Sequence, residues 1–156
     1  DRNDVTVIDT RNDYEVKLGT FENALPAGVE NFRDFPAAVA RLPAALKDET
    51  IVMFCTGGIR CEKASAYMLA QDFEQVFQLD GGILKYLETV PETENQWQGE
   101  CYVFDDRVAL RHGLDEGTFA TRRACGHPIE KAAASASPVE DDTASPCPLC
   151  ATGSAA

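Results

Sequence analysis

The residues with the clearest chemical potential form one loop of six, in the order Cys55-Thr56-Gly57-Gly58-Ile59-Arg60. Two consecutive glycines let the backbone curl until successive N–H groups point at the cysteine sulfur, and a helix that begins there adds its partial positive charge. Arg60 can supply a full positive charge. Because each of these features stabilises a thiolate, we expect the pKa of Cys55 to lie below the ordinary thiol value of about 8.5. The sequence therefore predicts Cys55 and Arg60 as catalytic residues, on an anion-binding loop completed by Thr56, Gly57, Gly58 and Ile59.

Two further cysteines have less certain chemistry. Cys61 directly follows Arg60, and two interpretations stay open: a second catalytic thiol that forms a transient disulfide with Cys55, or a small residue packed against a sheet. Cys101 lies in the run Cys-Tyr-Val-Phe without a charged anchor for a thiolate. We expect Cys101 to be a core or metal-proximal residue and not a nucleophile.

Four residues near the C-terminal end have the side chains of a zinc site: Cys125, His127, Cys147 and Cys150. Three thiols and one imidazole can close a tetrahedral zinc site, and the Cys-x-x-Cys spacing of the last pair is a usual half-site. A structural zinc ion would hold down a segment that lacks a core of its own. The alternative is a degenerate tail that binds no metal. No other cofactor is indicated by the sequence.

Apolar runs that alternate with helical stretches must position these groups. We expect strands at 5–8, 51–54, 76–79 and 101–104, and helices over 32–42, 62–71 and 83–88. Strands that alternate with helices indicate an α/β fold, a parallel sheet with helices on both faces. Ligands of such sheets bind at the carboxyl ends of strands, which is where the Cys55 loop follows its strand.

Composition and length limit the function classes. The chain has 156 residues and a formal charge of −12, with 14 Lys and Arg against 26 Asp and Glu, so bulk charge opposes unaided binding of nucleic acid. No apolar run approaches the roughly 20 residues that span a bilayer, so no membrane partner is expected. The six cysteines occur in three dissimilar contexts, which favours a reducing cytoplasm over a disulfide framework.

The length also suggests a division of the chain. We expect one well-cored domain over 1–98 and an irregular C-terminal extension over 99–156. Within the extension, 131–146 is mostly Ala, Ser, Pro, Asp and Glu and is predicted to be a linker. The first residue is Asp1, with neither Met nor a leader, which suggests a piece of a longer chain.

The loop 55–60, with Val-Ile-Asp-Thr-Arg at 7–11 upstream and Leu-Asp-Gly-Gly at 79–82 downstream, resembles a rhodanese homology domain. The resemblance implies a rhodanese-like fold, a loop cysteine that carries a persulfide, and an early Asp-x-Arg pair that braces the fold. The same fold also hosts phosphatases, whose loops have five residues between Cys and Arg. Four residues separate them here, which favours a sulfur-sized pocket.

Further motifs in the same order make the chain similar to one subgroup, the oxygen-dependent tRNA uridine hydroxylases, which convert wobble uridine to 5-hydroxyuridine. These motifs are Gly-Thr-Phe at 19–21, Gly-Gly-Ile-Leu-Lys-Tyr at 81–86 and Trp-Gln-Gly-Glu-Cys-Tyr-Val-Phe-Asp at 97–105. The resemblance implies an essential Cys55, tRNA as partner, molecular oxygen as co-substrate, and a preceding ferredoxin-like domain that helps to bind tRNA. It also implies a second Cys-x-x-Cys pair, but Arg122 stands where its first cysteine is expected.

Two other functions stay open. A sulfurtransferase would use the Cys55 persulfide as a donor to a thiol acceptor, and would transfer sulfur from thiosulfate to cyanide. A non-catalytic regulatory module is the third alternative, which the intact loop from Cys55 to Arg60 disfavours. For tRNA, the candidate basic groups near the loop are Arg11, Arg33, Arg60, Lys63 and Lys85.

Overall fold

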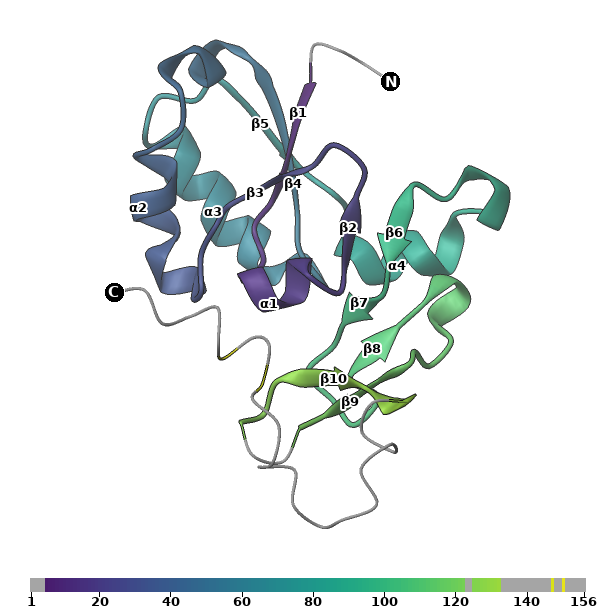
Figure 1. The fold of residues 1–156 in the computed structure, drawn as a ribbon. Coiled ribbons are helices and arrows are strands. Elements are labelled where there is room, and N and C mark those ends of the chain that lie inside the picture. The colour runs from purple at the N-terminus through teal and green to yellow at the C-terminus, as the bar shows by residue number, and fades with distance from the viewer. Residues whose placement is uncertain (1–4, 123–124, 133–146, 148–149, 151–156) are drawn as a thin grey trace.

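A four-stranded parallel sheet forms the centre of the molecule (Figure 1). The computed structural model describes residues 5–122, 125–132, 147 and 150. The strands are β1 (Val5–Asp9), β3 (Leu25–Pro26), β4 (Thr50–Phe54) and β5 (Gln75–Gln78), in the order β3-β1-β4-β5. Strands β1 and β4 pair along their full length, from Val5 opposite Thr50 to Asp9 opposite Phe54. Three of the four expected strands, those at 5–8, 51–54 and 76–79, are therefore confirmed to within one residue at each end.

Helices cover both faces of this sheet, as the sequence predicts. Helices α2 (Phe35–Val39) and α3 (Ile59–Leu69) pack on one face, and α4 (Gly82–Thr89) packs on the other. Strand β4 serves both layers, because Ile51 and Met53 join the first core cluster while Phe54 joins the second. This alternation follows from the period of two in a strand.

The helix expected over 32–42 is shorter than predicted. A 3-10 turn, η1 (Phe32–Asp34), leads into α2, which ends at Val39. Pro43 disfavours helical backbone at the residue before it, so the helix stops early although Leu42 still packs against the core. Three further 3-10 turns are η2 (Ala44–Asp48), η3 (Glu92–Glu94) and η4 (His112–Leu114).

Three small two-stranded sheets build the C-terminal extension, and the first of them joins it to the domain. Strand β2 (Gly19–Phe21), which follows the short helix α1 (Asp13–Val16), pairs with β6 (Trp97–Gly99). Strand β7 (Cys101–Tyr102) pairs with β8 (Ala109–Leu110), and β9 (Phe119–Thr121) pairs with β10 (Pro128–Glu130). These elements lie beside α1 and the end of α4 (Figure 1). The expected domain boundary after residue 98 falls inside β6 and stays a prediction, and most of the expected linker, 133–146, lies outside the described residues.

The strand predicted over 101–104 was too long. Strand β7 ends at Tyr102, and the chain turns at 105–107, where the Asp105 carboxylate accepts the Arg107 backbone N–H at 3.0 Å. Such an Asx turn competes with the strand ladder. Cys101 packs back on the domain in the second core cluster as expected, whereas Phe104 is 67% exposed.

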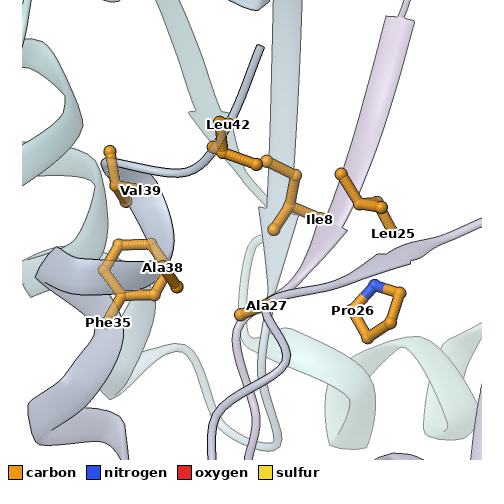
Figure 2. Close-up of a pocket in the computed structure, with 8 residues that line it drawn as sticks. All are labelled: Ile8, Leu25, Pro26, Ala27, Phe35, Ala38, Val39 and Leu42. Carbon is orange, nitrogen blue, oxygen red and sulfur yellow. The ribbon is translucent and has the colours of Figure 1, made fainter.

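An apolar cavity of about 10 Å³ lies between β1, β3 and α2 (Figure 2). Its walls include Ile8, Leu25 and Phe35, and it is about the size of one water molecule. Since its lining is almost entirely apolar, it offers no chemistry. Among the described residues, no helix is long and apolar enough to cross a bilayer.

Candidate active site

Cys55 follows β4 directly and lies at the carboxyl end of the sheet, where its residue is only 1% exposed. The Gly58 N–H donates a hydrogen bond to its sulfur at 3.2 Å, and the nearby backbone N–H groups of Arg60 and Cys61 help to lower its pKa. Gly58 precedes the first turn of α3 with a φ of +90°, a conformation that a side chain would strain. The loop thus forms the N–H cradle that its glycines predict.

The cradle holds Cys55 as a thiolate. The Cys61 thiol donates to the Cys55 sulfur, and this bond, the backbone N–H groups and the charge of Arg60 together outweigh burial and lower the pKa of Cys55 to about 5. The same hydrogen bond and burial raise the pKa of Cys61. Cys61 is itself fully buried in the first core cluster. The structure therefore adds a third role for Cys61, a hydrogen-bond donor to the thiolate, beside the two that the sequence left open.

Helix α4 holds the Cys55 loop through its carbonyl groups. Its first turn donates two hydrogen bonds to loop carbonyls, from Ile83 N–H to Cys55 O at 3.0 Å and from Leu84 N–H to Thr56 O at 3.1 Å. Gly82 lies so close that an added Cβ would be 2.6 Å from the Cys55 carbonyl oxygen. Because α4 binds the carbonyls, the loop N–H groups are turned toward the sulfur.

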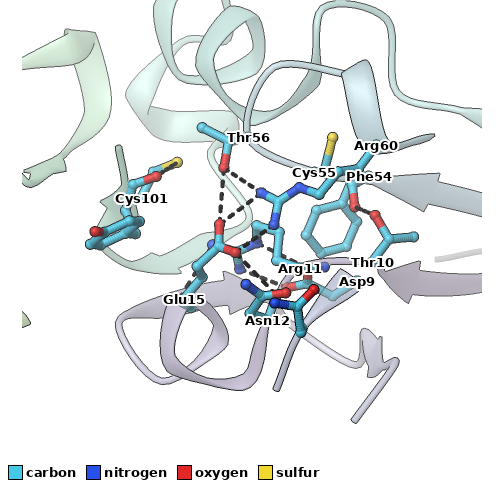
Figure 3. Close-up of polar contacts among 12 residues, drawn as sticks. Asp9, Thr10, Arg11, Asn12, Glu15, Phe54, Cys55, Thr56, Arg60 and Cys101 are labelled. Atoms are coloured by element: carbon cyan, nitrogen blue, oxygen red, sulfur yellow. Dashed lines mark hydrogen bonds and ion pairs between the residues drawn. The ribbon is translucent and has the colours of Figure 1, made fainter. Parts of the chain in front are cut away.

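Arg60 is anchored by a carboxylate that the sequence reasoning missed (Figure 3). Its guanidinium donates to both oxygens of Glu15, at 2.5 and 2.8 Å, and to Thr56 Oγ1 at 3.2 Å. Glu15 is fully buried on α1. Although burial opposes it, Glu15 raises the pKa of Arg60. The charge of Arg60 is thus shared between Glu15 and the thiolate, and the available signal was the Asn12-x-x-Glu15 capping box, which indicates a helix start but not this partner.

Asp9 and Arg11 form a second buried pair beneath the loop (Figure 3). Both are 0% exposed, their ion pair measures 2.6 Å, and the Arg11 guanidinium lies 5.0 Å over the Trp97 ring. This arrangement agrees with the bracing role that the resemblance implies. Arg11 was wrongly expected among the basic groups for tRNA, because a fully buried side chain cannot reach a substrate; Arg33, Lys63 and Lys85 are exposed.

An open pocket of about 420 Å³ extends from Cys55 to the surface. Its lining residues come from the loop, from α4 and from the extension: Cys55, Thr56, Gly57, Ile59, Arg60, Leu84, Val103, Phe104, Asp105 and Arg107. Ile59 and Phe104 are both more than two thirds exposed at this pocket, and the Arg60 guanidinium lies 5.7 Å over the Phe104 ring. The pocket thus combines an anionic sulfur with apolar, solvent-facing walls.

The family model described as the rhodanese-like domain matches residues 1–89. The chain belongs to the rhodanese-like domain family. It is 54% identical over 127 residues to a tRNA uridine(34) hydroxylase of Picosynechococcus sp. (strain ATCC 27264 / PCC 7002 / PR-6), covering 81% of this chain and 43% of that protein. It is 59% identical over 126 residues to a tRNA uridine(34) hydroxylase of Jannaschia sp. (strain CCS1), covering 81% of this chain and 42% of that protein.

The chain therefore spans less than half the length of these curated relatives. Among solved structures, it resembles the Alr3790 protein from Anabaena sp., with a TM-score of 0.49 and 19% identity, over 68% of this chain and 84% of that one. The family match confirms the rhodanese-like α/β fold that the sequence predicts.

Beyond the rhodanese-like match, the remaining cysteines fall into two environments. Cys101 is fully buried, and burial raises the pKa of its thiol to about 12. The four predicted metal ligands, Cys125, His127, Cys147 and Cys150, are brought together, with their ligand atoms all within 4.8 Å of one another. In the part of the chain that the structure describes, none of the six cysteines is in a disulfide.

Proposed function

We propose that this chain carries the reactive-thiol centre of a tRNA-modifying hydroxylase, which forms 5-hydroxyuridine at the wobble uridine with molecular oxygen as co-substrate. One observation carries the proposal: the Cys55 pocket has one wall from the rhodanese-like domain and another from residues 103–107, beyond the family match. A match of at least 126 residues in a chain of 156 necessarily spans both walls. The relatives that share this whole pocket region are named tRNA uridine(34) hydroxylases.

The pocket suits an unpaired base. Its volume of about 420 Å³ falls in the range of small-molecule sites. Proteins that read single-stranded RNA stack splayed-out bases on exposed aromatic rings, and Phe104 offers such a ring at this pocket. In this arrangement Phe104 and Ile59 would hold the uracil ring while Cys55 supplies the reactive sulfur beneath it.

The phosphate backbone of tRNA needs contacts beyond this pocket. Arg60 is bound to Glu15, and Arg107 donates to Asp105 at 2.7 and 3.0 Å, so both pocket arginines already have a carboxylate partner. The chain also has a net charge of −12. We therefore propose that tRNA is bound partly by a preceding domain of the full protein. We also propose that the reaction takes place in the cytoplasm, where tRNA is available and thiols stay reduced.

The test uses the full-length parent protein in cells that lack its gene. The cells are complemented with the wild-type gene, with Cys55→Ser, or with Cys101→Ser, a matched control for a buried cysteine outside the pocket. Bulk tRNA is digested and its 5-hydroxyuridine is measured by mass spectrometry. We expect the nucleoside with the wild-type and Cys101→Ser genes and not with Cys55→Ser. A level that does not depend on the gene would overturn the proposal.

A sulfurtransferase is the second candidate, because the N–H cradle around Cys55 would equally stabilise the terminal sulfur of a persulfide. The purified full-length protein is assayed for sulfur transfer from thiosulfate to cyanide and to small thiol acceptors. If sulfur transfer requires Cys55, and if cells with and without the gene have the same 5-hydroxyuridine level, the function is sulfur transfer and not hydroxylation. Absence of transfer would leave the hydroxylase proposal in place.

A further inference from the structure

We propose that Cys125, His127, Cys147 and Cys150 bind one structural Zn²⁺ ion, which ties the end of the extension to the rhodanese-like domain beside its active site. The four side chains come from two segments that are separated by about twenty residues. Their ligand atoms nevertheless lie within 4.8 Å of one another. His127 Nδ1 lies 3.3 Å from Cys150 Sγ and 3.7 Å from Cys147 Sγ.

The two separations between the His127 nitrogen and the sulfurs lie close to those of a tetrahedral zinc site. With Zn–S bonds of about 2.3 Å and Zn–N bonds of about 2.0 Å, two ligand atoms at a tetrahedral angle lie about 3.5–3.8 Å apart. A hydrogen bond between thiol and imidazole explains less, because a neutral imidazole nitrogen has one lone pair and two sulfurs approach it here. A single ion at the centre accounts for both contacts.

The backbone presents two of the ligands on a tight turn. Cys125 and His127 lie between β9 and β10, where the Arg122 N–H donates to His127 O and the Gly126 N–H donates to Arg122 O, both at 2.8 Å. Gly126 has a φ of +73°. Arg122 stands where a Cys-x-x-Cys pair would have its first cysteine. On this turn, the His127 ring supplies the second ligand beside Cys125 and approaches the sulfurs of Cys147 and Cys150.

The site is closed and therefore structural. Three thiolates and one imidazole satisfy all four positions of tetrahedral zinc, so no position is left for a substrate or a water. The ion would join Cys147 and Cys150 to the β9–β10 hairpin, and metal binding of this kind contributes folding free energy.

The location links this site to the pocket wall. The His127 ring lies 6.1 Å from that of Tyr14, which precedes Glu15, the anchor of Arg60. Tyr14 packs edge-on against Tyr102 at 5.2 Å, and Tyr102 packs against Phe104 at 5.0 Å. An ion that fixes His127 would therefore also steady the aromatic wall of the Cys55 pocket.

The first measurement is the metal content of the purified full chain by inductively coupled plasma mass spectrometry, after expression with zinc in the medium. We expect about one zinc ion per wild-type chain. His127→Gln and Cys150→Ser should each lose most of it, whereas His112→Gln should keep it. His112 is the matched control, since it is the other histidine of the chain and bonds to the Val90 carbonyl, away from the cluster.

The second measurement replaces zinc by cobalt in the wild-type chain, so that it does not depend on any variant folding. Tetrahedral cobalt with thiolate ligands gives intense visible d–d bands and a thiolate charge-transfer band in the near ultraviolet. A wild-type chain without stoichiometric zinc and without these bands would overturn the proposal. So would His127→Gln and Cys150→Ser chains with as much metal as His112→Gln. Neither readout depends on hydroxylase activity.

Discussion

Cys55 and Cys101 are equally buried, yet their thiols are held in opposite states. The pKa of Cys55 is lowered to about 5, whereas burial raises that of Cys101 to about 12. Cys101 lies in the second core cluster, where its thiol donates to the Tyr102 carbonyl at 3.6 Å, an acceptor that favours the protonated thiol. Cys55 instead receives a thiol and several N–H donors. Burial by itself therefore makes a cysteine inert, and converging donors make it reactive.

The largest expected effect is on alkylation by iodoacetamide at pH 7. Nearly every Cys55 is then a thiolate, but only about one Cys101 in 10⁵ is. Because low-pKa thiolates are weaker nucleophiles, we expect Cys55 to react at least about 100-fold faster, not 10⁵-fold. Peptide mass spectrometry over a time course gives both rates. The rapidly alkylated site should be absent in Cys55→Ala and present in Cys101→Ala. Equal rates at the two cysteines would contradict the predicted difference in their thiol pKa values.

The two cysteines should also give opposite pH dependences of stability. The folded-state pKa of Cys55 is depressed, so its contribution is present above the unfolded value of about 8.5 and is lost as the pH falls toward 5. The folded-state pKa of Cys101 is raised. Its contribution to the free energy of unfolding is therefore present below about pH 8.5 and is lost as the pH rises toward 12. Each slope approaches 1.4 kcal/mol per pH unit, about its maximum for one group.

Urea unfolding at a series of pH values measures these slopes. Relative to the wild type, Cys55→Ala should lose the rise in unfolding free energy between pH 6 and about 8. Cys101→Ala should show a shallower fall above about 8.5, because the raised pKa of Cys61 also contributes to that fall. The contrary result is a set of curves that stay parallel across the whole range.

A smaller effect concerns Cys61, the donor that distinguishes the two sites. Cys61→Ala removes a hydrogen bond to a charged acceptor, worth about 1.5–3 kcal/mol, so the pKa of Cys55 should rise by about 1–2 units. Cys61→Ser keeps a donor and should restore most of the shift. The pH profile of Cys55 alkylation measures the pKa. If both variants give the wild-type value, Cys61 is only a packing residue.

The smallest predicted change concerns the close contact between the start of α4 and the Cys55 loop. Gly82→Ala places a Cβ 2.6 Å from the Cys55 carbonyl at a φ of +66°, so it should cost about 1–3 kcal/mol of unfolding free energy and slow alkylation of Cys55. Gly57→Ala is the control, because its Cβ meets nothing within 4 Å, and it should stay within about 0.5 kcal/mol of the wild type. Thermal and urea unfolding compare the two, and equal stabilities would show that the close contact relaxes freely.

Local sequence patterns predicted the longer strands of the central sheet. The apolar runs of β1 and β4 were found because central parallel strands, covered on both faces, read as continuous apolar segments. The edge strand β5 was found from Val76 and Phe77, although Phe77 is 56% exposed. The two-residue strand β3 and the short β2 were missed, since such strands exist only through their pairing partners. Phe104 was placed in a strand because its neighbours are apolar, but the Asp105 turn ends that strand first.

The sequence by itself determined the loop from Cys55 to Arg60 and the rhodanese-like sheet, and it singled out Cys55 as the candidate reactive thiol. The local sequence predicts the cradle, because the Gly58 N–H that contacts the sulfur belongs to the same turn as Cys55. Only the tertiary structure decided which of 26 acidic residues holds Arg60, which segment walls the pocket, and that Cys125 and Cys150 meet. Those contacts join residues 20 to 50 positions apart, and their partners depend on the path of the chain through space, which no local pattern encodes.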